Sequence, residues 1–110
     1  MQAITIAESL WLEPTLLGVT LNYSDGPQGW QYRVGIGFRS LGECDKALKG
    51  RGTQWILQDK SLMIQGEGEL TLTFCPGTYM ERRFLLTGEA LQTFKSAIRF
   101  LALASEPQKN

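Results

Sequence analysis

The strict alternation of residues 30–39, WQYRVGIGFR, constrains the fold of this chain more than any other feature. Every even position carries a large apolar side chain, and every odd position carries a polar side chain or a glycine. Because successive side chains of a strand point to opposite faces, the pattern predicts a half-buried strand with Val34 and Ile36 turned into the core. Turn-forming residues at 24–29 precede it, so we expect a hairpin with a strand at 16–23.

The odd-numbered face of this strand is a candidate docking surface. Glycine inside a strand costs stability and often marks a place where another backbone comes close. We therefore predict that a partner in an extended conformation, a peptide or a nucleic-acid backbone, contacts Arg33, Gly35, Gly37 and Arg39. The alternative interpretation is that the glycines allow the sheet to curve and that the arginines are solvated.

Residues 40–49 change to a helical pattern. Leu41, Cys44 and Leu48 recur at helical spacing, and Ser40 is a suitable N-cap. Further strands are predicted at 3–7, 53–58, 62–65, 69–75 and 79–86, and a second helix at 88–104.

This order of elements predicts an α+β fold. We expect an antiparallel sheet of six or seven strands, with the short helix near 40–49 and the C-terminal helix near 88–104 packed on one face. Residues 1–104 form a single globular domain in this interpretation, and residues 105–110 form a frayed tail. Pro14 interrupts the apolar residues 10–12, so no separate strand is predicted there.

Two known topologies fit the same order of elements. One resembles a pleckstrin-homology barrel capped by its terminal helix, with the helix at 40–49 as an insertion. The other resembles the Whirly-type single-stranded DNA binders, whose modules consist of strands followed by a helix, roughly repeated. The second resemblance involves element order alone, without signature residues, and the neutral charge of the chain argues against transferring the DNA-binding function.

Charge and composition bear on the function. The chain has 11 basic and 11 acidic residues, no histidine and two cysteines. Without histidine, the usual general base and the commonest transition-metal ligand are missing, so we expect no catalytic residues, no metal site and no cofactor. Because there is no signal peptide, no membrane-spanning segment and no CxxC pair, we expect a cytoplasmic protein whose Cys44 and Cys75 are reduced.

A small basic cluster suggests a nucleic-acid-binding alternative. Lys46, Lys49 and Arg51 lead into Trp55, and cations beside an aromatic ring suit single-stranded nucleic acid. The competing interpretation is a helix C-terminus with lysines matched to the helix dipole, followed by a core tryptophan.

The C-terminal helix has two apolar residues outside its core stripe. On a helical projection, Phe100 lies about 180° and Leu103 about 120° from Leu91. Either a neighbouring segment covers these two side chains, or the two side chains form a dimer interface. We prefer the second interpretation. The core stripe itself is predicted to comprise Leu91, Phe94, Ala97, Ile98 and Leu101.

Two adjacent arginines occupy the last predicted strand. Because strand side chains alternate, either Arg82 or Arg83 must face the core side. There it is expected to pair with Glu67, Glu69 or Glu81 or to lie at the sheet edge. The sequence as a whole predicts a non-catalytic interaction module that binds another protein and forms a homodimer. The alternative is a single-stranded nucleic-acid-binding domain that uses a sheet face and a local basic patch.

Overall fold

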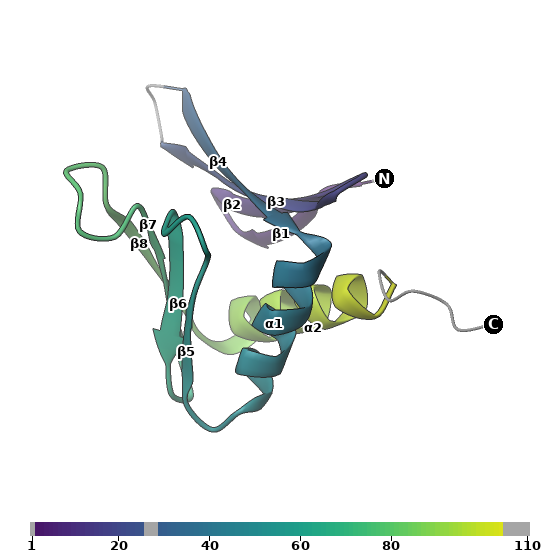
Figure 1. Ribbon diagram of the computed structural model, residues 1–110. Coiled ribbons are helices and arrows are strands. Elements are labelled where there is room, and N and C mark those ends of the chain that lie inside the picture. The colour runs from purple at the N-terminus through teal and green to yellow at the C-terminus, as the bar shows by residue number, and fades with distance from the viewer. Residues whose placement is uncertain (1, 26–28, 105–110) are drawn as a thin grey trace.

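The computed structural model describes residues 2–25 and 29–104, apart from the side chain of Trp30. Four antiparallel strands followed by a helix occur twice along the chain (Figure 1). The first repeat consists of β1 (Ile4–Ala7), β2 (Leu10–Thr15), β3 (Gly18–Asp25), β4 (Trp30–Gly37) and α1 (Phe38–Lys49). The second consists of β5 (Thr53–Ile56), β6 (Leu62–Gly66), β7 (Leu70–Phe74), β8 (Arg82–Leu86) and α2 (Gly88–Ala104).

The α+β class and the antiparallel pairing are confirmed, whereas the single sheet of six or seven strands is wrong. The strands form two four-stranded sheets, ordered β1-β2-β3-β4 and β5-β6-β7-β8. The first sheet crosses the upper part of Figure 1, the second runs down its left side, and the helices cross each other below. The repeated element order, strands followed by a helix, is present along the chain.

The additional strand is β2, which contains Pro14. Pro14 is paired with Val19 of β3, whereas β1 pairs only with residues 10–12 of β2. At Pro14, β2 therefore lies at the edge of the sheet. Proline is tolerated there because it lacks a backbone N–H and no neighbouring strand offers a carbonyl to which that N–H would donate. The connection to β3 is a two-residue turn, Leu16-Leu17. The predicted strand at 16–23 therefore began too early, because it included this turn.

Both helices contact each other, and both contact the sheets, α1 at β3, β4 and β5 and α2 at β1. The ranges near 40–49 and 88–104 are confirmed, although α1 begins at Phe38 with Gly37 as its N-cap, so Ser40 is not the cap. Val34 and Ile36 are buried as predicted, at 4% and 1% exposure. The predicted core stripe of α2 is also buried, and Ala102 joins it.

An aromatic cluster joins the inner faces of the two sheets. The rings of Tyr23 and Phe74 have centroids 4.8 Å apart, and those of Tyr23 and Phe84 lie 5.4 Å apart. Tyr32 stacks beside Tyr23, and its hydroxyl shares a 2.8 Å hydrogen bond with the Cys75 sulfur. These contacts connect β3 and β4 to β7 and β8, so a single core spans both repeats.

Arg82 is the arginine that faces the core side. Its guanidinium lies 5.1 Å from the Phe84 ring centroid and 3.3 Å from the Asp25 carboxylate on the first sheet. Its partner is thus an aspartate rather than one of the three glutamates considered above. Arg83 points to the outer face and pairs with Glu81 at 3.0 Å.

Among the described residues, no helix is both long and apolar enough to cross a membrane. Cys44 and Cys75 are both free thiols. The predicted frayed tail at 105–110 lies outside the described residues.

The burial of Ile36 predicts a measurable stability loss. Ile36→Ala should lower the free energy of unfolding by about 2–5 kcal/mol, because the shortened side chain leaves a cavity in the shared core. Urea denaturation followed by tryptophan fluorescence measures the change. A loss below about 0.5 kcal/mol would mean that this face of β4 does not belong to the core.

Candidate binding cleft

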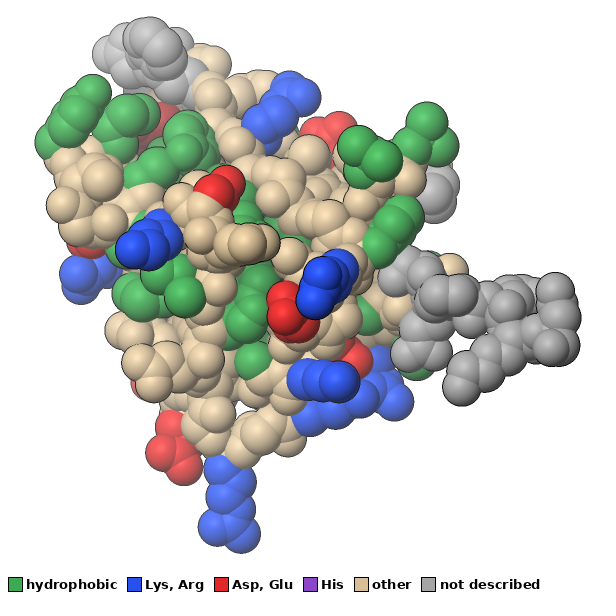
Figure 2. Space-filling model, in the orientation of Figure 1, with side chains coloured by type: hydrophobic (Ala, Val, Ile, Leu, Met, Phe, Trp, Pro, Cys, Tyr) green, Lys and Arg blue, Asp and Glu red, His purple; other side chains and the backbone are tan. Residues whose placement is uncertain are grey.

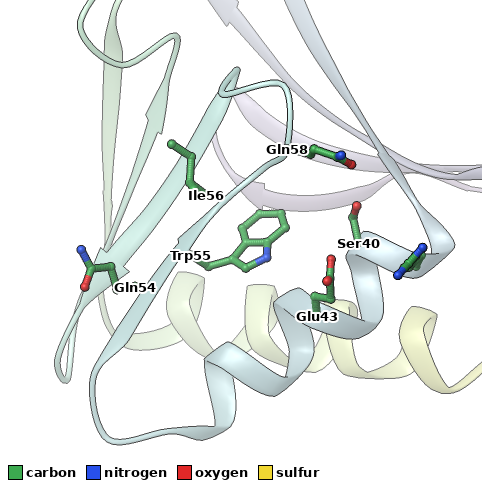
Figure 3. A pocket seen from close by; sticks show the side chains of 7 residues that line it. Ser40, Glu43, Gln54, Trp55, Ile56 and Gln58 are labelled. Atoms are coloured by element: carbon green, nitrogen blue, oxygen red, sulfur yellow. The ribbon is translucent and has the colours of Figure 1, made fainter.

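A cleft lies between the first turns of α1 and strand β5 (Figure 3). It consists of two adjoining depressions of about 550 Å³ and about 300 Å³, which share Ser40 and Gln58. The Trp55 side chain points toward α1, and Ser40 and Glu43 lie beside it in Figure 3. The larger depression is also lined by Arg39, Gln54 and Ile56, and the smaller one by Gly35, Gly37, Leu57 and Asp59.

One side of the cleft is the open edge of β4. The Phe38 N–H donates to the Leu17 carbonyl at 3.1 Å, which makes this a hydrogen-bonded pair of the ladder with β3. In an antiparallel ladder such pairs alternate, so the even-numbered residues of β4 bond to β3. The N–H and C=O groups of Arg33 and Gly35 consequently point to the free edge, because β3 is the only neighbour of β4 among the strands that the structure describes.

The other side of the cleft is the open edge of β5. The Leu57 N–H donates to the Leu62 carbonyl at 2.9 Å, and the same alternation directs the backbone groups of Gln54 and Ile56 away from β6. Because β5 is also an outer strand of its sheet, these groups have no strand partner within residues 2–25 and 29–104. Two unpaired strand edges therefore border one cleft.

The glycines of β4 are not required by the packing of the chain itself. A Cβ atom built at Gly35 would have no atom within 4 Å, and one at Gly37 would have only the Leu17 carbonyl oxygen at 3.8 Å. Gly18 on β3 differs, because its φ is 154° and a Cβ there would overlap the Ile36 backbone oxygen. The fold therefore requires a glycine at position 18. It does not require one at position 35, where the absence of a side chain leaves the backbone beside the edge of β4 exposed to solvent.

The charge of the cleft is mixed. Arg39 contributes a cation, and Glu43 and Asp59 contribute carboxylates. The Ser61 hydroxyl and backbone N–H donate hydrogen bonds to Asp59, and these bonds lower the pKa of its carboxyl. Acidic and basic side chains are also intermixed on the face shown in Figure 2. The cleft therefore lacks the one-signed positive field that attracts phosphates.

The structure brings together part of the predicted docking surface. Arg33, Gly35 and Gly37 are exposed on the outer face of β4, opposite Asn22, Thr20 and Gly18 of β3. Arg39 does not continue that face, because β4 ends at Gly37 and Arg39 belongs to α1, where it lines the cleft.

The predicted basic cluster does not gather around its tryptophan. Lys46 and Lys49 lie in the last turn of α1, and Lys49 pairs with Asp45 at 3.4 Å. Arg51 follows the helix in an exposed loop. Trp55 instead packs partly against the core and lines the cleft with Ser40 and Glu43, near the other end of α1.

Phe100 and Leu103 are exposed, at 68% and 49%, so neither is covered by another described segment. Beside them lies a shallow, open depression of about 440 Å³ between β1 and α2. It is lined by Ile4, Gln92, Thr93, Ser96, Ala97 and Phe100.

Cys44 and Tyr32 both have raised pKa values. Burial, together with the neighbouring Asp45, raises the pKa of the Cys44 thiol to about 12, so this cysteine is not a thiolate nucleophile at neutral pH. The hydrogen bond to Cys75, followed by burial, raises the pKa of Tyr32 to about 12. Within residues 2–25 and 29–104, no group of three or more histidine, cysteine or carboxylate side chains is arranged to hold a metal ion.

Comparisons of the chain with protein-family models, with curated protein sequences and with solved structures find no match. The chemistry of the cleft rests on its own groups: backbone donors and acceptors from two strand edges, one indole ring, one cation and two carboxylates. Of the β5 residues that line the cleft, the sequence singled out Trp55 but not Gln54 or Ile56, because nothing local marks this strand as lying beside α1.

A pair of substitutions tests whether Gly35 serves the fold. Gly35→Val should keep the free energy of unfolding within about 0.5 kcal/mol of the wild type or raise it, because valine suits a strand and meets no neighbour. Gly18→Ala, the matched control, should lose about 2 kcal/mol or more through strain and overlap. Thermal unfolding followed by circular dichroism measures both, and strong destabilisation by Gly35→Val would show that this glycine is needed for folding.

Proposed function

We propose that this protein is a non-catalytic interaction module that binds an extended segment of another protein in the cleft, by adding a strand to the open edge of β4. A peptide in the β conformation presents alternating N–H and C=O groups, and these match the unpaired groups of Arg33 and Gly35. The observation that carries the proposal is the bare, unpaired edge of β4 beside the cleft, with a glycine whose Cβ position is empty.

The surroundings of that edge support a peptide ligand. Across the cleft from β4, the Trp55 ring offers apolar surface to one ligand side chain, and Gln54 and Gln58 of the same wall offer amide groups. Exposed strand edges tend to pair with other chains unless charge, proline or a covering segment prevents it. Between Arg33 and Gly37, the odd positions of β4 carry one charged side chain and no proline.

The alternative is a single-stranded nucleic-acid-binding domain. The observation in its favour is that Arg39 and Trp55 line the same cleft, where a phosphate and a base would find a cation and a ring. Glu43 and Asp59 oppose it, because both carboxylates would face the phosphate chain. Nucleic acid also lacks the backbone groups that would pair with a strand edge.

We propose further that the protein forms a homodimer through Phe100 and Leu103. Each side chain left in water forgoes roughly 1.5–3 kcal/mol of burial. A two-fold interface would bury the pair from both copies with one self-complementary surface. This surface lies on α2, apart from the residues that line the cleft, so self-association and peptide binding can occur together.

Peptide binding is tested by selecting random dodecapeptides on phage against the immobilised protein. The Kd of a selected peptide is then measured by fluorescence anisotropy. Gly35→Pro should raise the Kd about tenfold or more, because proline removes the edge-facing N–H of residue 35 without removing a ladder bond to β3. Gly35→Ala is the matched control, keeps that N–H and should change the Kd by about twofold at most.

Equal affinity of the wild type and Gly35→Pro for the selected peptides would contradict strand addition at β4. A 20-nucleotide oligothymidylate titrated under the same conditions distinguishes the alternative. Phosphate-driven binding weakens steeply between 50 and 200 mM salt, whereas peptide binding by backbone pairing changes little. Tight, salt-sensitive binding of the oligonucleotide without any selected peptide would favour the nucleic-acid-binding domain.

A further inference from the structure

The larger depression of the cleft extends beyond the part of the β4 edge that would hold a peptide backbone. Gly35 lines the smaller depression, whereas Trp55 and Glu43 line the larger one. The two depressions meet at Ser40 and Gln58. A strand paired with Gly35 would therefore lie over the smaller depression, and a long side chain of that strand would enter the larger one. The chemistry of the larger depression determines which side chain it accepts.

Trp55 forms an aromatic wall of the larger depression. Its side chain is half-buried, packs partly against the core and points toward α1 in Figure 3. Among aromatic side chains the indole ring attracts cations best, and its flat face allows a planar guanidinium to stack. Within residues 2–25 and 29–104, the cation–π contacts both belong to Arg82, at other rings. The Trp55 ring is therefore open to a cation of a ligand.

Glu43 supplies a carboxylate beside this ring. It is exposed on α1 and lies next to Trp55 in Figure 3. None of the ion pairs among the described residues includes Glu43, although Arg39 lies one helical turn earlier and lines the same depression. Asp59 adds a carboxylate in the smaller depression, so two carboxylates stand against one guanidinium in the cleft. This balance favours a cation over an anion as the ligand group.

We infer that the larger depression binds an arginine side chain of the peptide, whose guanidinium stacks on Trp55 and donates hydrogen bonds to Glu43. This inference rests on the proposed peptide binding and names the residue that the peptide carries. Arginine suits the site better than lysine, because its guanidinium is planar and holds five N–H donors in a fixed fork. The Ser40 hydroxyl and the Gln58 amide offer further acceptors where the two depressions meet.

The role of the charge is tested on both partners. A peptide selected on phage against the wild type is made with each arginine replaced in turn by citrulline, which is nearly isosteric but neutral. Glu43→Gln, which keeps the size of the side chain, should raise the Kd of the arginine peptide about tenfold or more in fluorescence anisotropy. For the critical arginine, the citrulline peptide should bind the wild type and Glu43→Gln with affinities within about twofold.

Two further variants complete the test. Glu67→Gln removes an exposed carboxylate from the turn between β6 and β7 and is the matched control, with a change in Kd of about twofold at most. Trp55→Leu removes the stacking surface and should raise the Kd of the arginine peptide about fivefold or more. Circular dichroism checks the folding of each variant. If Trp55→Leu does not fold, the comparison of Glu43→Gln with Glu67→Gln still decides the outcome.

The contrary outcomes separate this inference from the proposed function. Selected peptides that lack arginine, or a Kd that Glu43→Gln leaves unchanged, would overturn the inference. Sensitivity of the same peptides to Gly35→Pro would then leave strand addition at β4 intact. Selection of peptides with aspartate or glutamate, whose binding is lost in Arg39→Gln, would show that the cleft takes an anion instead. Failure to select any peptide would overturn the proposed peptide binding, and the inference with it.

Discussion

The position at which α1 begins determines most of this architecture. β4 ends at Gly37 and α1 starts at Phe38, so the chain leaves the first sheet at once and cannot place another strand beside β4. When it returns as β5, it starts a second sheet, which leaves two strand edges unpaired on either side of the first turns of α1. The cleft and its unpaired backbone donors and acceptors follow from this one change of direction.

Local periodicity predicted the elements in which one face is buried. β4 and α2 were recognised because burial of one face imposes a period of two or of 3.6 residues on the sequence. β2 was missed because Pro14 was interpreted as a strand breaker, yet it lies where β1 no longer reaches. The number of sheets was also not predictable, because alternation shows which face is buried and not which strands are neighbours.

The candidate site was partly predictable for the same reason. Gly35 interrupts a regular strand pattern, and that signal is local, so the odd-numbered face of β4 was singled out before its surroundings were known. The open edge of β4 was not predicted, because it depends on which strands are neighbours. The wall supplied by β5 depends on how the two sheets pack, which no short stretch encodes. Arg82 shows the same limit: alternation indicated that one arginine faces the core side, but its partner Asp25 belongs to the other sheet.

Backbone amide exchange of the free protein tests the central claim, that the odd-numbered groups of β4 are unpaired. Followed by nuclear magnetic resonance, the amides of Arg33 and Gly35 should exchange at least about tenfold faster than those of Val34 and Ile36, which bond to β3. Adding a peptide that binds the cleft should slow the exchange of Arg33 and Gly35 selectively. Equal protection of odd and even amides in the free protein would contradict the account, because the edge of β4 would then already be paired.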